Sequence, residues 1–536
     1  MKMKWWQEAV VYQVYPRSFK DSNNDGIGDL QGIISKLDYI AYLGVDVIWL
    51  SPVYQSPNDD NGYDISDYYG IMEEFGTMED MELLIHEASL RGIKIIMDLV
   101  ANHTSTSHEW FVQATKDPSS KYHDYYYFRE NNGQVPNDLQ SVFLGSAWTL
   151  HEDLDAYYLH MFAKTQADLN WHNPEVRLEL YKMINWWLEK GIGGFRLDVI
   201  DYVAKDIDNK IITDGPLLHS YIQEMTRHTF NNYDVLTVGE TWGADTQKAI
   251  AYSNLDGSEL SMIFNFSHIL LDQEGEEKWD YKEVDLIELK RNFEERQRGL
   301  YQKGWDALFW CNHDLPRIVS RWGNDQKYRT ESAKMLATIL HLMQGTPYIY
   351  QGEELGMTNV CFDSIEDYRD IESINMYADR RQKGYSHEAI MDSIYHIGRD
   401  NARTPMQWDD SSYGGFSEVK PWIGVNANYQ EINVSRQQAD TSSVLSYYRR
   451  LIELRKKSQY RTLIREGSFE LVEAQHPDVF AYKRQYKQEE VLVVCNFRDY
   501  PVEFLEKGEK VILSNYDTLG EGNFLRPYEA IIYGLN

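Results

Sequence analysis

The sequence is poor in cysteine and contains no long apolar run. Its 536 residues include only three cysteines, an odd and scattered set that can form neither a disulfide framework nor a zinc site: Cys311, Cys361 and Cys495. No run of about 18 apolar residues occurs, and Gln7 and Glu8 interrupt the N-terminus where a signal peptide would have its apolar core. We therefore expect a cytoplasmic protein with no membrane partner.

Basic residues are also few. The 53 Lys and Arg face 84 Asp and Glu, so the net charge is −31, which repels nucleic acid and anionic membranes. Aromatic residues, in contrast, make up 14% of the chain, and although most are expected in the core, those in a cleft would suit stacking on sugar rings. We expect a monomer whose partner is a small, neutral molecule.

Short β-branched runs alternate with amphipathic stretches of helical period, as in repeated β/α units around a parallel sheet. Eight such runs occur, at residues 9–15, 45–52, 93–103, 193–201, 235–241, 260–266, 307–314 and 347–353. Eight parallel strands can close into a (β/α)8 TIM barrel, whose active site is built at the carboxyl ends of the strands. The length also leaves room for smaller domains besides the barrel.

Two segments break this alternation. Residues 104–168 are rich in Tyr, Asn and Asp and too long for an ordinary βα loop, so they predict an inserted lobe after the third strand. After an amphipathic helix at 442–457, alternating strands predict a C-terminal antiparallel β-domain. The predicted barrel then covers 1–103 and 169–463, and the predicted β-domain covers 464–536.

Carboxylates end several of the predicted strands. Asp198 follows Arg196 by two residues, and residues two apart in a strand project to the same side, so Arg196 is expected to keep Asp198 ionised. Taken alone, this pair is more often a structural ion pair. Glu240 ends the next run beside Trp242, where partial desolvation is expected to raise its pKa.

Asp314 ends a later run beside His313, and His103 closes an earlier one. In order and spacing, the four segments that contain His103, Asp198, Glu240 and Asp314 resemble the conserved regions of the α-amylase superfamily, glycoside hydrolase family 13. The likeness covers essentially the whole chain and is closest to the oligo-1,6-glucosidase and dextran glucosidase (glucan 1,6-alpha-glucosidase) group. It implies a retaining, exo-acting enzyme that hydrolyses α-1,6 bonds at the non-reducing end of isomaltooligosaccharides, panose or dextran-derived oligosaccharides.

The resemblance assigns roles to these residues. Glycosidic cleavage needs one carboxylate against the anomeric carbon and one carboxylic acid that protonates the leaving oxygen. By resemblance, Asp198 is the nucleophile, Glu240 the general acid/base and Asp314 the carboxylate that holds the distorted sugar. The resemblance also places four residues around the same sugar: His103, Phe143, Arg196 and His313.

Further matches concern substrate specificity. Asp60 and Tyr63 lie in a loop that resembles the loop of exo-acting members, where Tyr63 would stack on the terminal glucose and Asp60 would pair with Arg399. Without the family pattern, this loop would be interpreted as an Asx-rich surface turn. Val199 matches the residue that accompanies α-1,6 preference. Three residues match positions that hold the leaving glucose: Trp242, Lys278 and Glu372.

The first loop spaces hard oxygen ligands at alternate positions. An EF-hand is excluded because Gly32 stands where that motif needs a glutamate. The loop resembles the calcium loop of the glucosidase group, which implies a structural Ca2+ and no organic cofactor, and an acidic turn without metal is the alternative. The implied ligands are four side chains and the backbone carbonyl of Ile27: Asp21, Asn23, Asp25 and Asp29.

Alternative functions use the same scaffold. They are α-1,4-glucosidase, sucrose isomerase or glucosyltransferase, and trehalose-6-phosphate hydrolase, which would need a basic cluster for the phosphate. Residues 316–323 lack the arginine- and aspartate-rich motif of the isomerases. A non-catalytic binding partner such as the heavy subunits of amino-acid transporters would have lost catalytic residues, whereas this chain keeps all three carboxylates.

Overall fold

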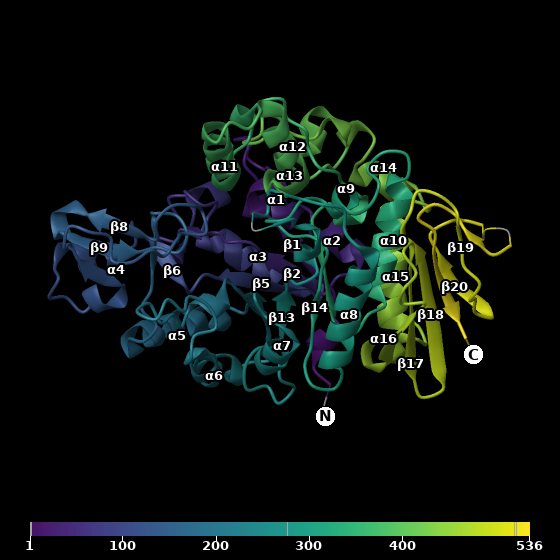
Figure 1. Cartoon of the computed structure of the whole chain (residues 1–536), viewed down its shortest axis with the longest axis horizontal. Coiled ribbons are helices and arrows are strands. Elements are labelled where there is room, and N and C mark those ends of the chain that lie inside the picture. Colours follow the sequence, from purple (N-terminus) through teal and green to yellow (C-terminus); the bar gives the residue numbers. More distant parts are fainter. Residues whose placement is uncertain (1–2, 276, 519, 521, 536) are drawn as a thin grey trace.

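The computed structural model describes residues 3–275, 277–518, 520 and 522–535, and its centre is a barrel of eight parallel strands (Figure 1). The strands are β1 (Val11–Val14), β2 (Val47–Leu50), β5 (Lys94–Leu99), β11 (Gly194–Leu197), β12 (Leu236–Thr241), β13 (Met262–Asn265), β14 (Ala307–Leu308) and β15 (Thr346–Tyr350). They are hydrogen-bonded in the order β13-β12-β11-β5-β2-β1-β15-β14, and a parallel bridge between Ile263 and Asp306 links the two end strands. The predicted TIM barrel is confirmed.

The eight predicted runs overlap the eight strands, but most were drawn too long, and the run at 307–314 contains a strand of only two residues. The run at 193–201 ends as a strand at Leu197, so Asp198 lies just beyond the end of β11. The run at 93–103 divides into β5 and a separate short strand that begins at His103. Gly194 starts β11 at φ +135°, and a Cβ there would lie 1.8 Å from the carbonyl oxygen of Leu236 on β12. Only glycine allows the two backbones to approach so closely.

Helices surround the barrel and begin at side-chain caps that the sequence provides. Thr77 and Asp80 form a capping box at α3, Asn173 precedes Pro174 at α5, and Asp285 caps α8. The main barrel helices are α3 (Met78–Leu90), α5 (Pro174–Glu189), α6 (Leu218–His228), α7 (Thr246–Tyr252), α8 (Leu286–Leu300), α10 (Arg329–His341) and α15 (Val444–Lys457). Shorter helices are α1 (Leu30–Ser35), α2 (Leu37–Leu43), α9 (Ile318–Arg321), α14 (Val434–Ala439) and α16 (Arg461–Glu466).

A lobe follows the third barrel strand and projects to one side of the barrel (blue in Figure 1). It begins and ends in an antiparallel pair in which His103 lies opposite Asp168. This pairing brings both ends of the lobe back to the barrel rim. The elements of the lobe are β6 (His103–Ser105), α4 (Glu109–Lys116), β7 (Phe128–Glu130), β8 (Trp148–His151), β9 (Ala156–Leu159) and β10 (Gln166–Asp168).

Two further parts complete the molecule. A helical cap (green in Figure 1) follows the eighth barrel strand and contains α11 (Ile371–Gln382), α12 (His387–Ile397) and α13 (Asp400–Arg403). The C-terminal antiparallel sheet (yellow in Figure 1) confirms the predicted β-domain, in the order β16 (Ser468–Val472), β17 (Val479–Tyr486), β18 (Glu489–Asn496), β22 (Ala530–Gly534) and β20 (Lys510–Ser514). In the described part of the chain, no helix is long and apolar enough to cross a membrane.

Candidate active site

One guanidinium joins three carboxylates at the carboxyl ends of neighbouring strands. Arg196 on β11 lies beside Asp98 on β5, and its Nη1 donates to Asp98 at 2.5 Å and to Asp198 at 2.7 Å. Its Nη2 donates to Glu240 on β12. We call Arg196, Asp98, Asp198 and Glu240 the Arg196 cluster. The two predicted reacting carboxylates therefore share one cation.

The Arg196 cluster is almost fully buried, and Arg196 is only 1% exposed. Burial raises the pKa of Asp98 to about 6 although Arg196 acts in the opposite direction. Burial likewise raises the pKa of Asp198 well above its usual range. Arg196 acts to lower this pKa, and the charges of Glu240 and Asp98 act to raise it. Arg196 acts on the pKa of Asp198 in the expected direction, but burial has the larger effect and raises it. The predicted proton on Glu240 stays a prediction.

Two guanidinium groups form a second cluster across the site. Asp314, after β14, accepts from Arg403 at 2.7 Å and from Arg399 at 3.2 Å, and Arg399 also pairs with Asp370 at 2.5 Å. Burial acts to raise the pKa of Asp314, but His313, Arg399 and Arg403 hold it well below its usual range. Arg399 and Arg403 do the same for Asp370 against its burial. We call Arg399, Arg403, Asp314 and Asp370 the Arg399 cluster. Its two carboxylates are permanently ionised.

The predicted end-recognition residues meet beside the Arg399 cluster. Arg399 Nη2 lies 3.8 Å from an Asp60 oxygen, and Gln166 donates to the other Asp60 oxygen at 3.0 Å. Burial raises the pKa of Asp60 to about 7 against the effect of Arg399. The ring of Phe143 lies under the same guanidinium, 5.3 Å from its carbon. The structure therefore brings Asp60, Phe143 and Arg399 together.

Two buried histidines line the space between the clusters. The rings of His313 and Tyr63 are nearly parallel with centroids 5.4 Å apart, and Tyr63 Oη lies 2.7 Å from His313 Nε2. His103 lies 3.1 Å from the Tyr63 carbonyl oxygen and from Gln166. Burial lowers the pKa of His313 to about 3 and that of His103 to about 4, so both rings are neutral above pH 5 and can donate to sugar hydroxyls.

Val199 has an unusual backbone conformation. It directly follows Asp198 and has φ 35° and ψ 48°, in the left-handed region, where a β-branched residue is a strained outlier. It is therefore not a strand residue, as the sequence pattern had suggested. In this conformation its N–H donates to Glu240 at 3.2 Å. The backbone after the predicted nucleophile thus holds the predicted acid.

The predicted leaving-group residues lie at the mouth of the site. Trp242 stacks on Phe266 with centroids 4.0 Å apart and donates to Glu240 at 3.1 Å. Lys278 and Glu372 form an ion pair of 2.5 Å, and Glu372 also lies 3.3 Å from Arg399. A cavity of about 50 Å³ is lined in part by Trp242, Lys278 and Asp314.

Sequence reasoning missed three members of the two clusters. Arg403 lies four residues after Arg399 in a short helix, so helical spacing could have placed it on the same face. Asp98 lies inside the predicted run at 93–103, and only the register of β5 against β11 brings it to Arg196. Asp370 caps α11, and no feature of the sequence links it to Arg399.

The first loop is closed by its own hydrogen bonds. Asp21 accepts from the backbone N–H groups of Asn23, Asn24 and Gly26, and Asp29 caps α1 by accepting from Gly32 at 2.6 Å. Asn23 and Asp25 each accept from the residue two further on, Asp25 and Ile27. Among described residues, no group of three or more His, Cys, Asp or Glu is arranged to hold a metal.

Nevertheless, the charge of this loop suits a cation. Asp21 and Asp29 are 1% and 4% exposed, and no Lys, Arg or His in the described part pairs with them or with Asp25. Buried carboxylates without a counter-charge are costly, and hard oxygen ligands are those that Ca2+ takes. The donor set therefore fits a calcium ion, although the loop would have to turn its oxygens toward the ion.

Known proteins resemble the chain over its whole length. Residues 13–466 match the family described as Alpha amylase, catalytic domain, and residues 469–507 match Maltogenic Amylase, C-terminal domain. The chain is 53% identical to a glucan 1,6-alpha-glucosidase of Streptococcus pneumoniae and 51% identical to an oligo-1,6-glucosidase of Halalkalibacterium halodurans, each over 99% of both chains. The crystal structure of a trehalose-6-phosphate hydrolase of Bacillus licheniformis superimposes with a TM-score of 0.94 at 47% identity, over 99% of this chain and 100% of that one.

Proposed function

The chain belongs to the α-amylase family of glycoside hydrolases, and we propose that it is a retaining, exo-acting α-glucosidase that hydrolyses α-1,6 bonds of short glucans from the non-reducing end. The observation that carries this proposal is the guanidinium of Arg196, which binds Asp198 and Glu240 at once. A shared cation favours the short carboxylate separation of retaining enzymes, about 5–5.5 Å, over the longer one of inverting enzymes.

The mechanism follows from these positions. An Asp198 oxygen bonds to the anomeric carbon while the bond to the leaving sugar breaks, and the leaving oxygen takes the proton of Glu240. Glu240 then removes a proton from water, the water oxygen bonds to the anomeric carbon, and the ester to Asp198 breaks. Asp314, held ionised by two guanidinium groups, stabilises the positive charge that develops on the sugar in both steps.

Exo-action is supported by the residues that meet around Arg399. Asp60, Phe143 and Arg399 meet there, and Gln166 from the lobe strand β10 fixes Asp60. A terminal glucose would offer its hydroxyls to Asp60 and Arg399. A glucan that continued beyond this glucose would collide with these residues.

A neutral leaving sugar is supported by the charges at the mouth. Lys278 is paired with Glu372, and Arg321, which lines the same small cavity, makes two bonds of 2.6 Å to Asp272. These two cations are already neutralised by carboxylates, so neither is free for a phosphate group. This argues against trehalose 6-phosphate as the substrate, even though a hydrolase of that name is similar in structure.

The test is a product analysis on isomaltose, panose, dextran, maltose, sucrose and trehalose 6-phosphate. We expect glucose from isomaltose and panose, with kcat/KM on isomaltose above that on maltose. NMR of the fresh product should show α-glucose, because two displacements restore the configuration. Initial release of β-glucose contradicts the retaining mechanism, and preference for maltose or for the phosphorylated sugar contradicts the substrate.

Calcium, monomeric state and cytoplasmic location belong to the same proposal. Side chains of Asp21, Asn23, Asp25 and Asp29 with the Ile27 carbonyl would hold a Ca2+ that stabilises the first loop, and the unpaired buried carboxylates support it. A reducing compartment is supported by three free thiols, of which Cys311 and Cys495 are buried. Elemental analysis, light scattering and cell fractionation test these three points in turn.

A further inference from the structure

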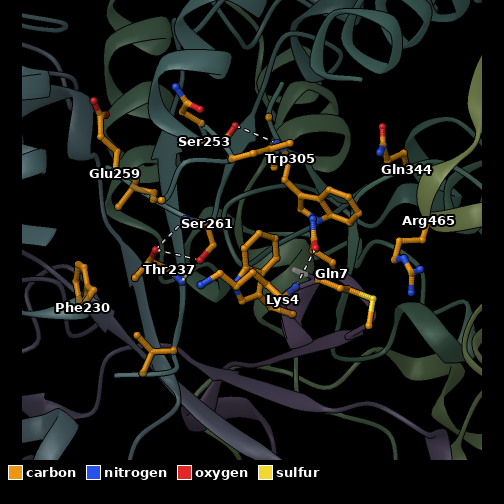
Figure 2. A pocket seen from close by; sticks show the side chains of 18 of the residues that line it. Lys4, Gln7, Phe230, Thr237, Ser253, Glu259, Ser261, Trp305, Gln344 and Arg465 are labelled. Atoms are coloured by element: carbon orange, nitrogen blue, oxygen red, sulfur yellow. Dashed lines mark hydrogen bonds between the residues drawn. The ribbon is translucent and has the colours of Figure 1, made fainter. Parts of the chain in front are cut away.

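A cavity that Figure 2 shows from close by lies at the opposite end of the barrel from Asp198. Its volume is about 490 Å³, within the range of small-molecule sites, about 300–1,000 Å³. It is bordered by Thr237 where β12 begins and by Ser261 and Trp305, which precede β13 and β14. These are the amino ends of the strands, whereas Asp198 and Glu240 lie at their carboxyl ends, so the cavity is separate from the candidate active site.

We propose that this cavity binds a glucan segment without cleaving it. Its inner wall is aromatic, because Phe230 and Trp305 are buried and contribute to the lining, and Figure 2 shows both around the hollow. Tyr233 and Tyr301 are half-buried further out. Tyr233 and Tyr301 can offer flat apolar faces to the C–H faces of a sugar, whereas Phe230 and Trp305, only 5% and 3% exposed, are closed off by their neighbours.

Several polar side chains of the cavity are neutral and are free to form hydrogen bonds with a ligand. Asn231, Gln302 and Gln344 bring side-chain amides to its lining, and these amides make no hydrogen bond to any described residue. The hydroxyls of Tyr233 and Tyr301 are also without a partner among the described residues. Amides and hydroxyls can both donate and accept, as can sugar hydroxyls, so the two sets are complementary.

The charged groups that border the cavity are mostly compensated. Glu259 accepts from His219 at 2.9 Å and from Gln223 at 3.0 Å. Arg465 is bound by the carboxylates of Glu8 and Glu466. Neither residue is left to attract an ion, and the other two charged side chains of the lining, Lys4 and Asp234, have opposite signs, which favours a neutral polyhydroxylated ligand over a phosphate or a cation.

The consequence concerns long substrates. A glucan held at the far end of the barrel keeps other chain ends near the active site, which raises their effective concentration without a new catalytic contact. Isomaltose is too short to gain from this. The choice of an α-1,6 glucan as ligand rests on the proposed function.

Affinity electrophoresis in native gels that contain dextran tests the site. The enzyme should be retarded by dextran, and Asp60→Ala, which opens the catalytic end, should leave most of the retardation in place. Tyr301→Ala and, independently, Gln344→Ala should weaken the apparent affinity at least fivefold while kcat/KM on isomaltose stays within twofold. Tyr500→Ala, an exposed tyrosine outside the cavity, is the matched control and should migrate like the parent.

The outcomes separate this site from the proposed function. Retardation that is lost in Asp60→Ala and kept in both cavity variants overturns the second site, as does a parent enzyme that dextran does not retard. Hydrolysis of isomaltose is measured separately, so a failure of the catalytic proposal appears there. Gels with glycogen in place of dextran report whether an α-1,6 chain is preferred.

Discussion

The Arg196 cluster and the Arg399 cluster contain the same kinds of residue in different proportions. One guanidinium serves Asp98, Asp198 and Glu240, whereas Arg399 and Arg403 together serve Asp314 and Asp370. Burial acts to raise the pKa of both Asp198 and Asp314, although 21% of the Asp314 side chain is exposed, against 9% of the Asp198 side chain. The pKa of Asp198 is nevertheless raised and that of Asp314 lowered. The ratio of cations to carboxylates, rather than burial, separates them.

This difference explains how two kinds of carboxylate arise a few strands apart. In the Arg196 cluster, three carboxylates face one guanidinium, and burial raises the pKa of both Asp98 and Asp198. A raised pKa is what allows a buried carboxyl group to hold a proton near neutral pH. In the Arg399 cluster, the charges balance, so Asp314 stays ionised and can stabilise a cationic transition state. Proton transfer and charge stabilisation are thereby kept apart.

The largest effects are expected when one carboxylate in each cluster is replaced. Glu240→Gln should lower kcat on isomaltose by about a hundred- to ten-thousand-fold, since general acid help is worth that much. Asp314→Asn should cause a loss of similar order through transition-state stabilisation. The variants should differ on 4-nitrophenyl α-glucoside, whose leaving group needs no proton. There the first step should recover in Glu240→Gln and stay slow in Asp314→Asn.

Burst kinetics with the nitrophenyl substrate, beside melting curves of both variants, make the measurement. Equal melting temperatures ensure that loss of activity is not loss of fold. If Glu240→Gln stays as slow as Asp314→Asn in the burst phase, Glu240 is not the acid. Activity of Glu240→Gln near that of the parent on isomaltose contradicts the assignment of the whole Arg196 cluster.

A smaller effect is expected at Val199, whose N–H bonds to Glu240 and whose side chain lies beside the predicted nucleophile. Val199→Ala and Val199→Thr should reduce the preference for isomaltose over maltose by about ten- to two-hundred-fold, because one methyl or methylene contact is worth about 1–3 kcal/mol of discrimination. The ratio of kcat/KM on the two sugars is the measurement. A ratio independent of residue 199 would place specificity in Trp242, Lys278 or Glu372.

Much of this arrangement could be predicted from the sequence, and the exceptions share a cause. Strand ends are local features, so Asp198, Glu240 and Asp314 could be located by their place after apolar runs. The sharing of Arg196 depends on the register between β5 and β11, which no local pattern encodes. The left-handed Val199 contradicts its own β propensity because tertiary packing overrides it. The far cavity draws ordinary residues from many separate segments, so no motif marks it.

Removing one negative charge from the Arg196 cluster should bring its ratio of cations to carboxylates closer to that of the Arg399 cluster. In Asp98→Asn, Arg196 has two carboxylates to serve instead of three, and one charge that raises the pKa of Asp198 is gone. The nucleophile must be ionised, so activity rises with pH as Asp198 loses its proton. A lower pKa therefore shifts the acid limb of the kcat/KM profile to lower pH, by about one unit if the removed interaction is worth about 1.4 kcal/mol.

The raised pKa of Asp98 also predicts how the free energy of unfolding depends on pH. Its pKa is raised to about 6 in the folded protein, above the usual value of 3.8, so the folded state holds its proton more tightly. This stabilisation is present below pH 4 and lost as the pH rises through about 6. The Asn variant lacks this pH dependence, and its loss of stability relative to the parent should be smaller at pH 8 than at pH 4. For the activity, an acid limb of the kcat/KM profile of Asp98→Asn that stays in place, or moves to higher pH, contradicts the account.

The smallest effect concerns the first loop, which supports the Arg399 side alone. Asp21 accepts from Ser417 at 2.6 Å, and Ser18 just before the loop donates to the carbonyl oxygen of Arg403. A calcium ion bound only by the folded state stabilises it by RT ln(1 + [L]/Kd), about 2.7 kcal/mol at a hundredfold excess over Kd. For a chain of this size, chelation should lower the melting temperature by a few degrees and raise KM more than it lowers kcat, because Arg399 is the residue that we propose to bind the end of the substrate.

Calorimetry with and without chelator, and the same kinetics after adding back Ca2+, make the measurement. Asp25→Asn is the matched variant, since its exposed side chain can lose its charge with little effect on packing, and its melting temperature should respond less to Ca2+. A melting curve that ignores chelator, together with protein that contains no metal on elemental analysis, would falsify the calcium proposal. A fall in kcat with unchanged KM would instead show that the loop acts on the Arg196 cluster, and the two clusters would then not be supported independently.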